Sequence, residues 1–283
     1  MHFCQFRAGG IVIGVYTPEK LALKEPYSSF LCENQQSDVI VRFDYIKEIG
    51  NICGNVISNA DSFTVSEDPE NFYFYYHATG ESDYYALRKV AKNNQTEHEI
   101  FIPEKYTGMI WTRLVFSLLN FDDVAAHFGC TVFHASFIEH NGESILFTAP
   151  CETGKSTQAA LWEKYTDAEI INGDKVLLYE KDGRIMASGL PFSGSSDICK
   201  NRILNVRAIV YLGQAKSNKI NRLKGIKAYK AVFEGCYYSG WNPDYNKTVA
   251  LLAEKIAVST PVYHLECLPD KTAVDLLFET IYA

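Results

Sequence analysis

The order of apolar and polar positions divides the chain into a strand-rich first part and a mixed second part. Up to about residue 105, short runs of alternating character such as "IVIGVY", "SDVIVRFDYI" and "NFYFYYHA" are separated by Pro, Gly, Asn and Asp. Alternation with a period of two is typical of strands with one buried face. From Thr107 to Phe128 the apolar residues follow helical spacing, and Gly129 stands where a C-terminal cap is expected. We therefore expect a β-rich region over residues 1–105 and a second domain over residues 106–283.

The second part alternates strands and helices. The segment "CTVFHASFIEHNGESILFTAP" contains two apolar strands joined at Asn141-Gly142, a strong signal for a β-hairpin. Cross-strand partners in that hairpin have numbers that sum to 283, which places His134 opposite Ala149. Further elements are expected as a helix in "STQAALWEKY", a buried strand in "AEIIN", a hairpin turned at Asp182-Gly183, a helix around 249–257, a strand in "PVYHLEC" and a last helix starting near Asp270. The fold class is α/β, with mixed α and β elements.

Composition narrows the class of protein. The 283 residues are 47% hydrophobic and 22% charged, as in ordinary soluble globular proteins. The net charge of -7, from 27 basic and 34 acidic residues, argues against nucleic acid or an anionic membrane as the main partner. No signal peptide or membrane helix is indicated, and the eight cysteines form no C-x-x-C pair that would suggest zinc or a disulfide framework. We expect a cytoplasmic protein.

The segment "APCETGKST", residues 149–157, ends like a phosphate-binding loop. A strand, a tight turn ending in Gly-Lys-Ser and a helix form an anion trap, because backbone N–H groups and the helix N-terminus face the ligand. We expect Lys155 to reach the β- and γ-phosphates of ATP and the Ser156 hydroxyl to bind Mg²⁺. The residues expected to contact nucleotide are Ala149, Pro150, Cys151, Glu152, Thr153, Gly154, Lys155, Ser156 and Thr157.

Glu152 is the physical objection to this loop. A carboxylate about 7 Å from a phosphate charge costs about 2 kcal/mol at an effective dielectric of about 20, and a left-handed backbone adds about 1–2 kcal/mol. Both costs are escaped if the side chain points to solvent and the backbone stays right-handed. We expect micromolar affinity for nucleotide.

Two residues outside the loop are candidates for the chemistry. Asp174 is the first carboxylate after the expected strand "AEIIN" and would complete the metal shell. His134 is expected beside the mouth of the loop, where it is either a catalytic imidazole or a core histidine. The sequence pattern leaves that choice open.

Several separated blocks resemble one superfamily in the same order. "HASFIEHNGESILFTAPCETGKSTQAALW", "INGDKVLL", "GLPFSGSSDICKNR" and "RAIVYLGQAKSNKINRL" are similar to the HPr serine kinase and phosphoenolpyruvate carboxykinase superfamily, in particular its small HPr-kinase-related branch. The resemblance covers roughly residues 125–283 and, more loosely, the front. It implies an HPr kinase/PEP carboxykinase-like P-loop fold, a mixed sheet flanked by helices. It also implies that Lys155 contacts phosphates, that Ser156 or Thr157 and Asp174 serve Mg²⁺, and that His134 lies near the site.

The chain departs from that superfamily at Gly173. Members that transfer phosphate to serine carry there the acidic residue that acts as general base, whose loss costs about 10²–10⁴-fold. His134, Asp174 or Asp197 are possible substitutes. The segment "GSSDICKNR" is similar to the far wall of the superfamily's site, so its polar residues are candidates for binding an acceptor or a phosphate: Ser195, Ser196, Lys200 and Arg202.

These observations favour an ATP-dependent kinase that transfers the γ-phosphate directly to a hydroxyl, with serine of a peptide or protein as the expected acceptor and a gene neighbour as one acceptor to test. The alternative is a nucleotide-binding regulatory module that has lost turnover, and a third is a structural protein that binds no nucleotide. A carboxykinase is disfavoured because the extra basic residues and second metal site are not apparent. HPr as acceptor is disfavoured because "DLLFETIYA" does not resemble the assembly segment of HPr-directed members. The acceptor and the oligomeric state, a homo-oligomer included, stay open.

Overall fold

The computed structural model describes residues 1–23, 25–78, 83–150, 152–194 and 197–283. These residues form two compact units. The first contains Met1–Phe128 and Ser239–Pro243, and the second contains Gly129–Tyr238 and Asp244–Ala283. The boundary expected near residue 105 thus lies before two helices that belong to the first unit.

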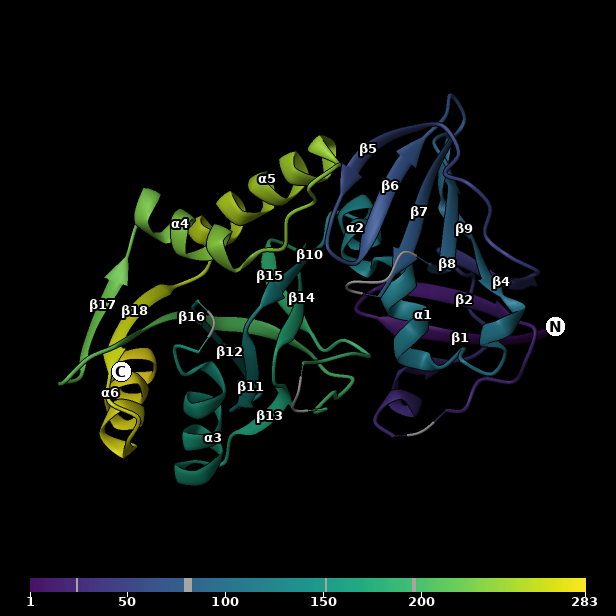
Figure 1. Ribbon diagram of the computed structural model, residues 1–283. Helices are drawn as coiled ribbons and strands as arrows, with labels where there is room; N and C mark the ends of the chain where they lie inside the picture. The colour runs from purple at the N-terminus through teal and green to yellow at the C-terminus, as the bar shows by residue number, and fades with distance from the viewer. Residues whose placement is uncertain (24, 79–82, 151, 195–196) are drawn as a thin grey trace. The chain divides into compact units, whose positions relative to one another are not determined.

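The first unit is built on a mixed sheet. Within the described residues it has nine strands in the order β3-β1-β2-β4-β9-β8-β7-β6-β5 (Figure 1). β4 pairs in parallel with β2 and β9, and its alternating residues Val39, Val41 and Phe43 are buried, as the period of two predicts. The strands are β1 His2–Ala8, β2 Ile11–Thr17, β3 Leu31–Cys32, β4 Val39–Ile46, β5 Asn55–Asn59, β6 Phe63–Glu67, β7 Asn71–His77, β8 Tyr84–Ala91 and β9 Asn94–Pro103. Two short 3₁₀ turns are Tyr27–Phe30 and Glu104–Tyr106.

The helix expected over Thr107–Phe128 is two helices, α1 Thr112–Leu119 and α2 Phe121–His127. Asn120 separates them with a left-handed φ of 48°, a conformation that asparagine tolerates better than most residues. The buried Arg88 of β8 donates a hydrogen bond to the carbonyl of Leu119 and lies over the ring of Phe74. The cap predicted at Gly129 is confirmed by its φ of 68°.

The second unit is built on another mixed sheet, also nine-stranded in the described part of the chain. Its main path is β10-β14-β15-β16-β12-β11-β13, with β18 beside β16 and β17 beside β18. The twelve-residue strand β16 pairs with β15 through its first residues and in parallel with β12 and β18 through the rest. The strands are β10 Thr131–His134, β11 Ser136–His140, β12 Glu143–Thr148, β13 Glu169–Asn172, β14 Lys175–Lys181, β15 Arg184–Ser188, β16 Ile203–Gln214, β17 Lys219–Leu223 and β18 Val262–Cys267.

The hairpin at Asn141-Gly142 is confirmed, with φ values of 53° and 75° that suit a tight two-residue turn. Its register is the expected one from Ser136 opposite Phe147 to His140 opposite Glu143. The predicted pairing of His134 with Ala149 is wrong, because the strand is interrupted at Ala135. His134 ends β10, which pairs with β14 and sets His134 opposite Lys175.

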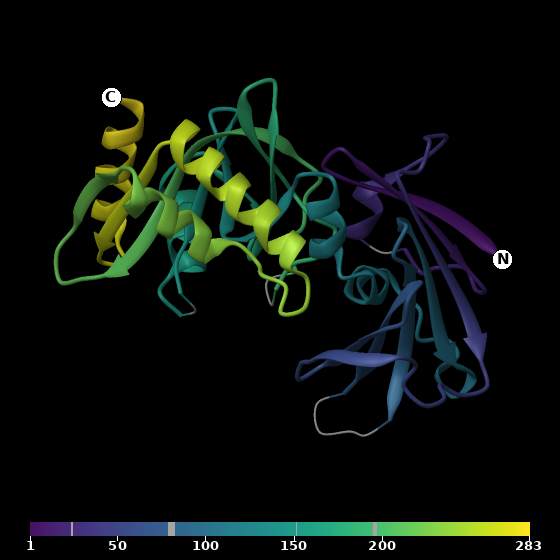
Figure 2. The same ribbon diagram turned by 90° about the horizontal axis from the view of Figure 1, so that it is seen from above.

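Helices cover both faces of the second sheet (Figures 1 and 2). α3 Lys155–Tyr165 and α6 Lys271–Tyr282 lie on one face, where Phe147, Val210 and Leu265 pack against Trp162 and Leu277. α4 Ile226–Gly235 and α5 Pro243–Ser259 lie on the other. The helix predicted to start near Asp270 is confirmed, since the Asp270 side chain accepts a hydrogen bond from the backbone N–H of Thr272 at 2.9 Å. Of the helices in the described ranges, none combines the length and apolar character that a membrane span needs.

Candidate functional site

The loop after β12 leads directly into α3. Gly154 adopts a φ of 112°, which strongly favours glycine, and the first intrahelical bond runs from the Gln158 N–H to the Gly154 carbonyl at 2.9 Å. Within the described part of the loop no side chain caps this helix, and Ser156 and Thr157 in its first turn are exposed. A helix N-terminus in this position directs N–H groups and the positive end of its dipole toward the loop.

Lys155 holds its ammonium group inside the loop. The residue is only 8% exposed, and Nζ donates hydrogen bonds to the carbonyl oxygens of Ala149 at 3.0 Å and Pro150 at 3.3 Å. Hydrogen bonds to two backbone carbonyls hold this buried ammonium group in one place inside the loop. The strand–loop–helix context therefore sets a fixed positive charge next to the helix N-terminus.

Glu152 meets only one of the two conditions for escaping its cost. Its side chain is exposed, but its backbone is left-handed, with a φ of 61°. The carbonyl of Glu152 accepts a hydrogen bond from Nε2 of Gln214 at 3.3 Å, which ties the turn to the end of β16. Cys151, the neighbouring candidate, lies outside the described residues.

Asp174 is placed by a turn that Asn172 organises. The Asn172 side chain is fully buried, and its Oδ1 accepts hydrogen bonds from the backbone N–H of Asp174 at 3.0 Å and of Lys175 at 2.9 Å. Nδ2 of Asn172 donates to the Phe192 carbonyl at 3.0 Å. This Asx-type turn fixes the backbone at the end of β13 and presents the Asp174 carboxylate there.

His134 contacts Asp174 directly. Its Nδ1 lies 3.2 Å from Oδ1 of Asp174 and 3.1 Å from the Asp174 carbonyl oxygen. The hydrogen bond from His134 lowers the pKa of the Asp174 carboxyl against the opposing effect of burial, and the charges of Lys175 and Lys155 lower it further. Lys155 thus acts electrostatically on Asp174, although the two residues come from different elements. The Thr148 hydroxyl donates to the His134 carbonyl at 2.9 Å, which joins β12 to this cluster.

Sequence reasoning missed three aromatic and cationic neighbours of this pair. The Lys175 ammonium lies 5.0 Å from the ring centre of Tyr237 and 5.6 Å from that of Phe192. Tyr237 meets the His134 ring edge-on at 6.4 Å between centroids. Tyr237 follows α4, a helix that was not predicted, so no spacing along the chain indicated this contact. Phe192 stands inside the quoted block "GLPFSGSSDICKNR", which is the one signal that pointed to it.

The remaining candidates lie elsewhere or cannot be placed. Lys200 pairs with Glu169 at 2.8 Å, and Arg202 lies 3.7 Å from Glu139. Glu169 begins β13, whereas Asp174 follows its end, so these ion pairs hold both cations toward the opposite end of that strand. Asp197 is exposed, and Ser195 and Ser196 lie outside the described residues.

The donors that are present suit Mg²⁺ bound together with phosphates. The described residues contain no group of three or more His, Cys, Asp or Glu side chains that could hold a metal ion alone. Mg²⁺ ordinarily uses one or two protein oxygens, substrate phosphates and waters. Asp174 Oδ1 faces His134, while a Cβ at Gly194 would approach Oδ2 to 3.1 Å, so the glycine keeps space beside the second oxygen. Asp174 and Ser156 are the residues that would hold the ion.

Comparisons with known proteins add only distant structural similarity. No protein-family model matches the chain. No curated protein matches it either. A solved structure, that of the Hpr(Ser) kinase/phosphatase from Coxiella burnetii, is similar with 13% sequence identity and a TM-score of 0.31, covering 53% of this chain and 87% of that chain. Similarity at this level assigns no family.

Proposed function

We propose that this chain is an ATP-dependent kinase that transfers the γ-phosphate to a serine hydroxyl of a peptide or protein. The observation that carries the proposal is that the contacting pair His134 and Asp174 is tied to the strand leading into the Lys155 loop, because the Thr148 hydroxyl donates to the His134 carbonyl at 2.9 Å. Phosphoryl transfer depends mainly on positioning and on stabilising the charge of the phosphates. Lys155 at the helix N-terminus stabilises the phosphate charge, and the ionised Asp174 carboxylate positions the groups around it.

In this proposal the loop binds the phosphate chain. The backbone N–H groups at the start of α3 and the Lys155 ammonium donate to phosphate oxygens, and Lys155 exchanges its carbonyl partners Ala149 and Pro150 for them. Asp174 and Ser156 would hold Mg²⁺, which would neutralise charge on the phosphates. Lys175, close to the rings of Tyr237 and Phe192, adds a second positive charge beside Asp174.

We assign the proton-accepting role to His134. Gly173 offers no side chain where the resembling superfamily has its base, so another group must accept the hydroxyl proton. A neutral imidazole that donates through Nδ1 to Asp174 carries its lone pair on Nε2, which is then the acceptor for the serine proton. Asp174 holds this orientation of the ring, as carboxylates do for catalytic histidines in other enzymes.

The test is transfer of radiolabel from γ-labelled ATP to a degenerate peptide library with a fixed central serine, with central alanine as the matched control. His134→Gln is expected to lower transfer by about 10²–10⁴-fold while leaving nucleotide affinity unchanged. Adding Gly173→Asp to His134→Gln restores a base at the position where the superfamily has one and recovers part of the activity. Equal activity in wild type and His134→Gln contradicts the assigned role.

A second function is favoured by two features: Glu152 has a left-handed backbone in the loop, and Gly173 stands where the resembling superfamily has its general base. It is a regulatory module that binds nucleotide without turnover. ATP would then raise the melting temperature, yet no serine peptide would be labelled and the γ-phosphate would stay intact for hours.

A further inference from the structure

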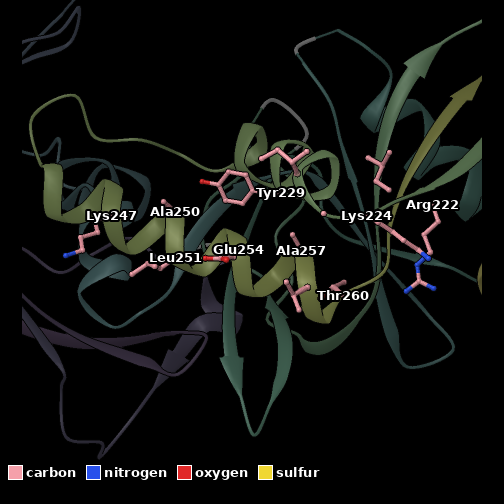
Figure 3. A pocket seen from close by; sticks show the side chains of 13 residues that line it. Arg222, Lys224, Tyr229, Lys247, Ala250, Leu251, Glu254, Ala257 and Thr260 are labelled. Carbon is pink, nitrogen blue, oxygen red and sulfur yellow. The ribbon is translucent and has the colours of Figure 1, made fainter.

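A groove on the second unit lies between α5, the start of α4 and the end of β17 (Figure 3). Its volume is about 770 Å³, within the range of about 300–1,000 Å³ that is typical of ligand pockets. Figure 3 shows Lys247 at one end and Arg222 at the other, with Tyr229 and side chains of α5 between them. None of the nucleotide-site candidates that the structure describes lines this groove.

The walls of the groove are aliphatic and exposed. Ile226 of α4 is 66% exposed, and Leu251 and Val258 of α5 are 54% and 83% exposed. Leu251 and Val258 lie seven residues apart, hence on one stripe of the helix, while Val249, Leu252 and Ile256 on the other stripe are buried. An exposed apolar stripe on a helix that already buries another is typical of an interaction surface.

The segment that supplies one wall of the groove carries a charge opposite to that of the chain. Residues 216–230 contain six cations and no Asp or Glu, in a protein with a net charge of -7. None of these six forms an ion pair within the described ranges, unlike Lys200 and Lys255, which pair with glutamates. Among the described residues, Glu254 is the one carboxylate that lines the groove, beside the cations Arg222, Lys224 and Lys247, and the exposed Lys227 follows the lining residue Ile226 in the chain. The six cations are Lys216, Lys219, Arg222, Lys224, Lys227 and Lys230.

We infer that this groove binds an acidic peptide segment of a partner protein, with apolar side chains between Ile226 and Leu251 and carboxylates beside Lys224 and Lys227. Aliphatic walls with cations at the rim match such a peptide in both shape and charge. Single-stranded nucleic acid is a poorer match because it stacks its bases on several aromatic rings, and Tyr229 is the one aromatic side chain among the described residues of the lining.

The groove is joined to the nucleotide site by α4. Ile226 begins this helix at the groove, and Cys236 and Tyr237 follow its end, where Tyr237 meets His134. The helix is about 15 Å long, a distance that about five residues of extended peptide span. A serine about five residues from the docked segment therefore reaches the site. Docking of a substrate peptide rests on the proposed kinase function, whereas binding of the acidic peptide itself does not.

The test is selection of displayed random 12-residue peptides on the full chain, followed by fluorescence polarisation of the selected peptides. We expect sequences enriched in Asp and Glu together with Leu, Ile, Phe or Met. Leu251→Glu and the double variant Lys224→Glu/Lys227→Glu are expected to weaken their Kd by about tenfold or more, because a carboxylate replaces an apolar or cationic contact. The matched control is Lys20→Glu/Lys47→Glu, two exposed lysines on the first unit, which changes the charge by as much as the double variant does and leaves Kd unchanged.

The side chains substituted in the groove and in its control are exposed, so melting temperatures within about 2 °C of wild type establish that those variants fold. Lys155→Met should retain peptide binding, which separates failure of the groove from failure of the nucleotide site. Four results overturn the inference: recovery of no peptides, peptides without acidic enrichment, equal binding by Leu251→Glu, or occupation of the groove by something else. The last is detected as a dimer that Leu251→Glu dissociates, or as oligouridine binding that Lys224→Glu/Lys227→Glu abolishes.

Discussion

Substitutions of Glu152 separate the effect of its backbone conformation on stability from the effect of its charge on nucleotide affinity. Its φ of 61° is left-handed, which costs a non-glycine residue about 1–2 kcal/mol. Glu152→Gly removes that cost, and the greater freedom of glycine in the unfolded chain takes back about 0.5–1 kcal/mol. The net gain is about 0.5–1 kcal/mol, or about 1–4 °C in melting temperature. Glu152→Gln keeps the left-handed backbone and removes only the charge, so its melting temperature should equal that of wild type.

The effect on nucleotide affinity follows from charge alone. A carboxylate about 7 Å from a phosphate repels it, but the side chain is exposed and solvent screens most of the interaction. We expect both variants to tighten the Kd for Mg-ATP by about fivefold, and the gain to shrink between about 0.05 and 0.5 M salt. Calorimetry gives the affinity and differential scanning fluorimetry of the nucleotide-free protein gives the stability. An unchanged Kd in Glu152→Gln, or a lower melting temperature in Glu152→Gly, refutes the reasoning.

Three further predictions test the site and the core of the first unit. Hydrogen bonding to His134 lowers the pKa of Asp174, so this interaction stabilises the fold above the unfolded-state pKa of about 3.8, and the stabilisation is lost as pH falls through the lower folded-state pKa. The stability of Asp174→Asn should therefore depend less on pH over that window in acid unfolding. At neutral pH the same variant should abolish phosphate transfer. Gly194→Ala places a Cβ 2.9 Å from Cγ of Asp174, so transfer should fall by about tenfold or more while Ser193→Ala stays near wild type. Burial lowers the pKa of His98 to about 3, so falling pH destabilises the fold through His98 below about 6.5. Burial also raises the pKa of Asp123 to about 7, so falling pH stabilises the fold through Asp123 from about 7 to 4. Asp123→Asn should therefore make the loss of stability in acid steeper, and identical urea midpoints for variant and wild type from pH 4 to 7 contradict this.

Local signals in the sequence predicted much of the fold. The turns at Asn141-Gly142 and Asp182-Gly183 have positive φ at both residues, as the residue types imply. The cap at Asp270 and the strand–loop–helix order around Gly154 also follow from local chemistry. In each case the residues that specify the structure are adjacent in the chain.

What was missed depends on contacts between distant segments. The interruption at Ala135 moves His134 to a different strand pair, because β10 finds its partner in β14 rather than continuing the hairpin. The position of Tyr237 depends on α4, a short amphipathic helix that follows β17. The sequence before α4 has no strong signal for the start of a helix. His134 still reaches the loop region through Thr148, so the expected proximity arises from a different set of contacts.

The measurement that most directly tests the central claim is calorimetric titration of the chain with Mg-ATP, with Lys155→Met as the matched variant that keeps the aliphatic stem. The account predicts micromolar affinity in wild type and a loss of about 10–100-fold in Lys155→Met, the effect of removing a charge-assisted hydrogen bond. No heat at millimolar nucleotide, or equal affinity in both proteins, contradicts a phosphate-binding loop at residues 149–157.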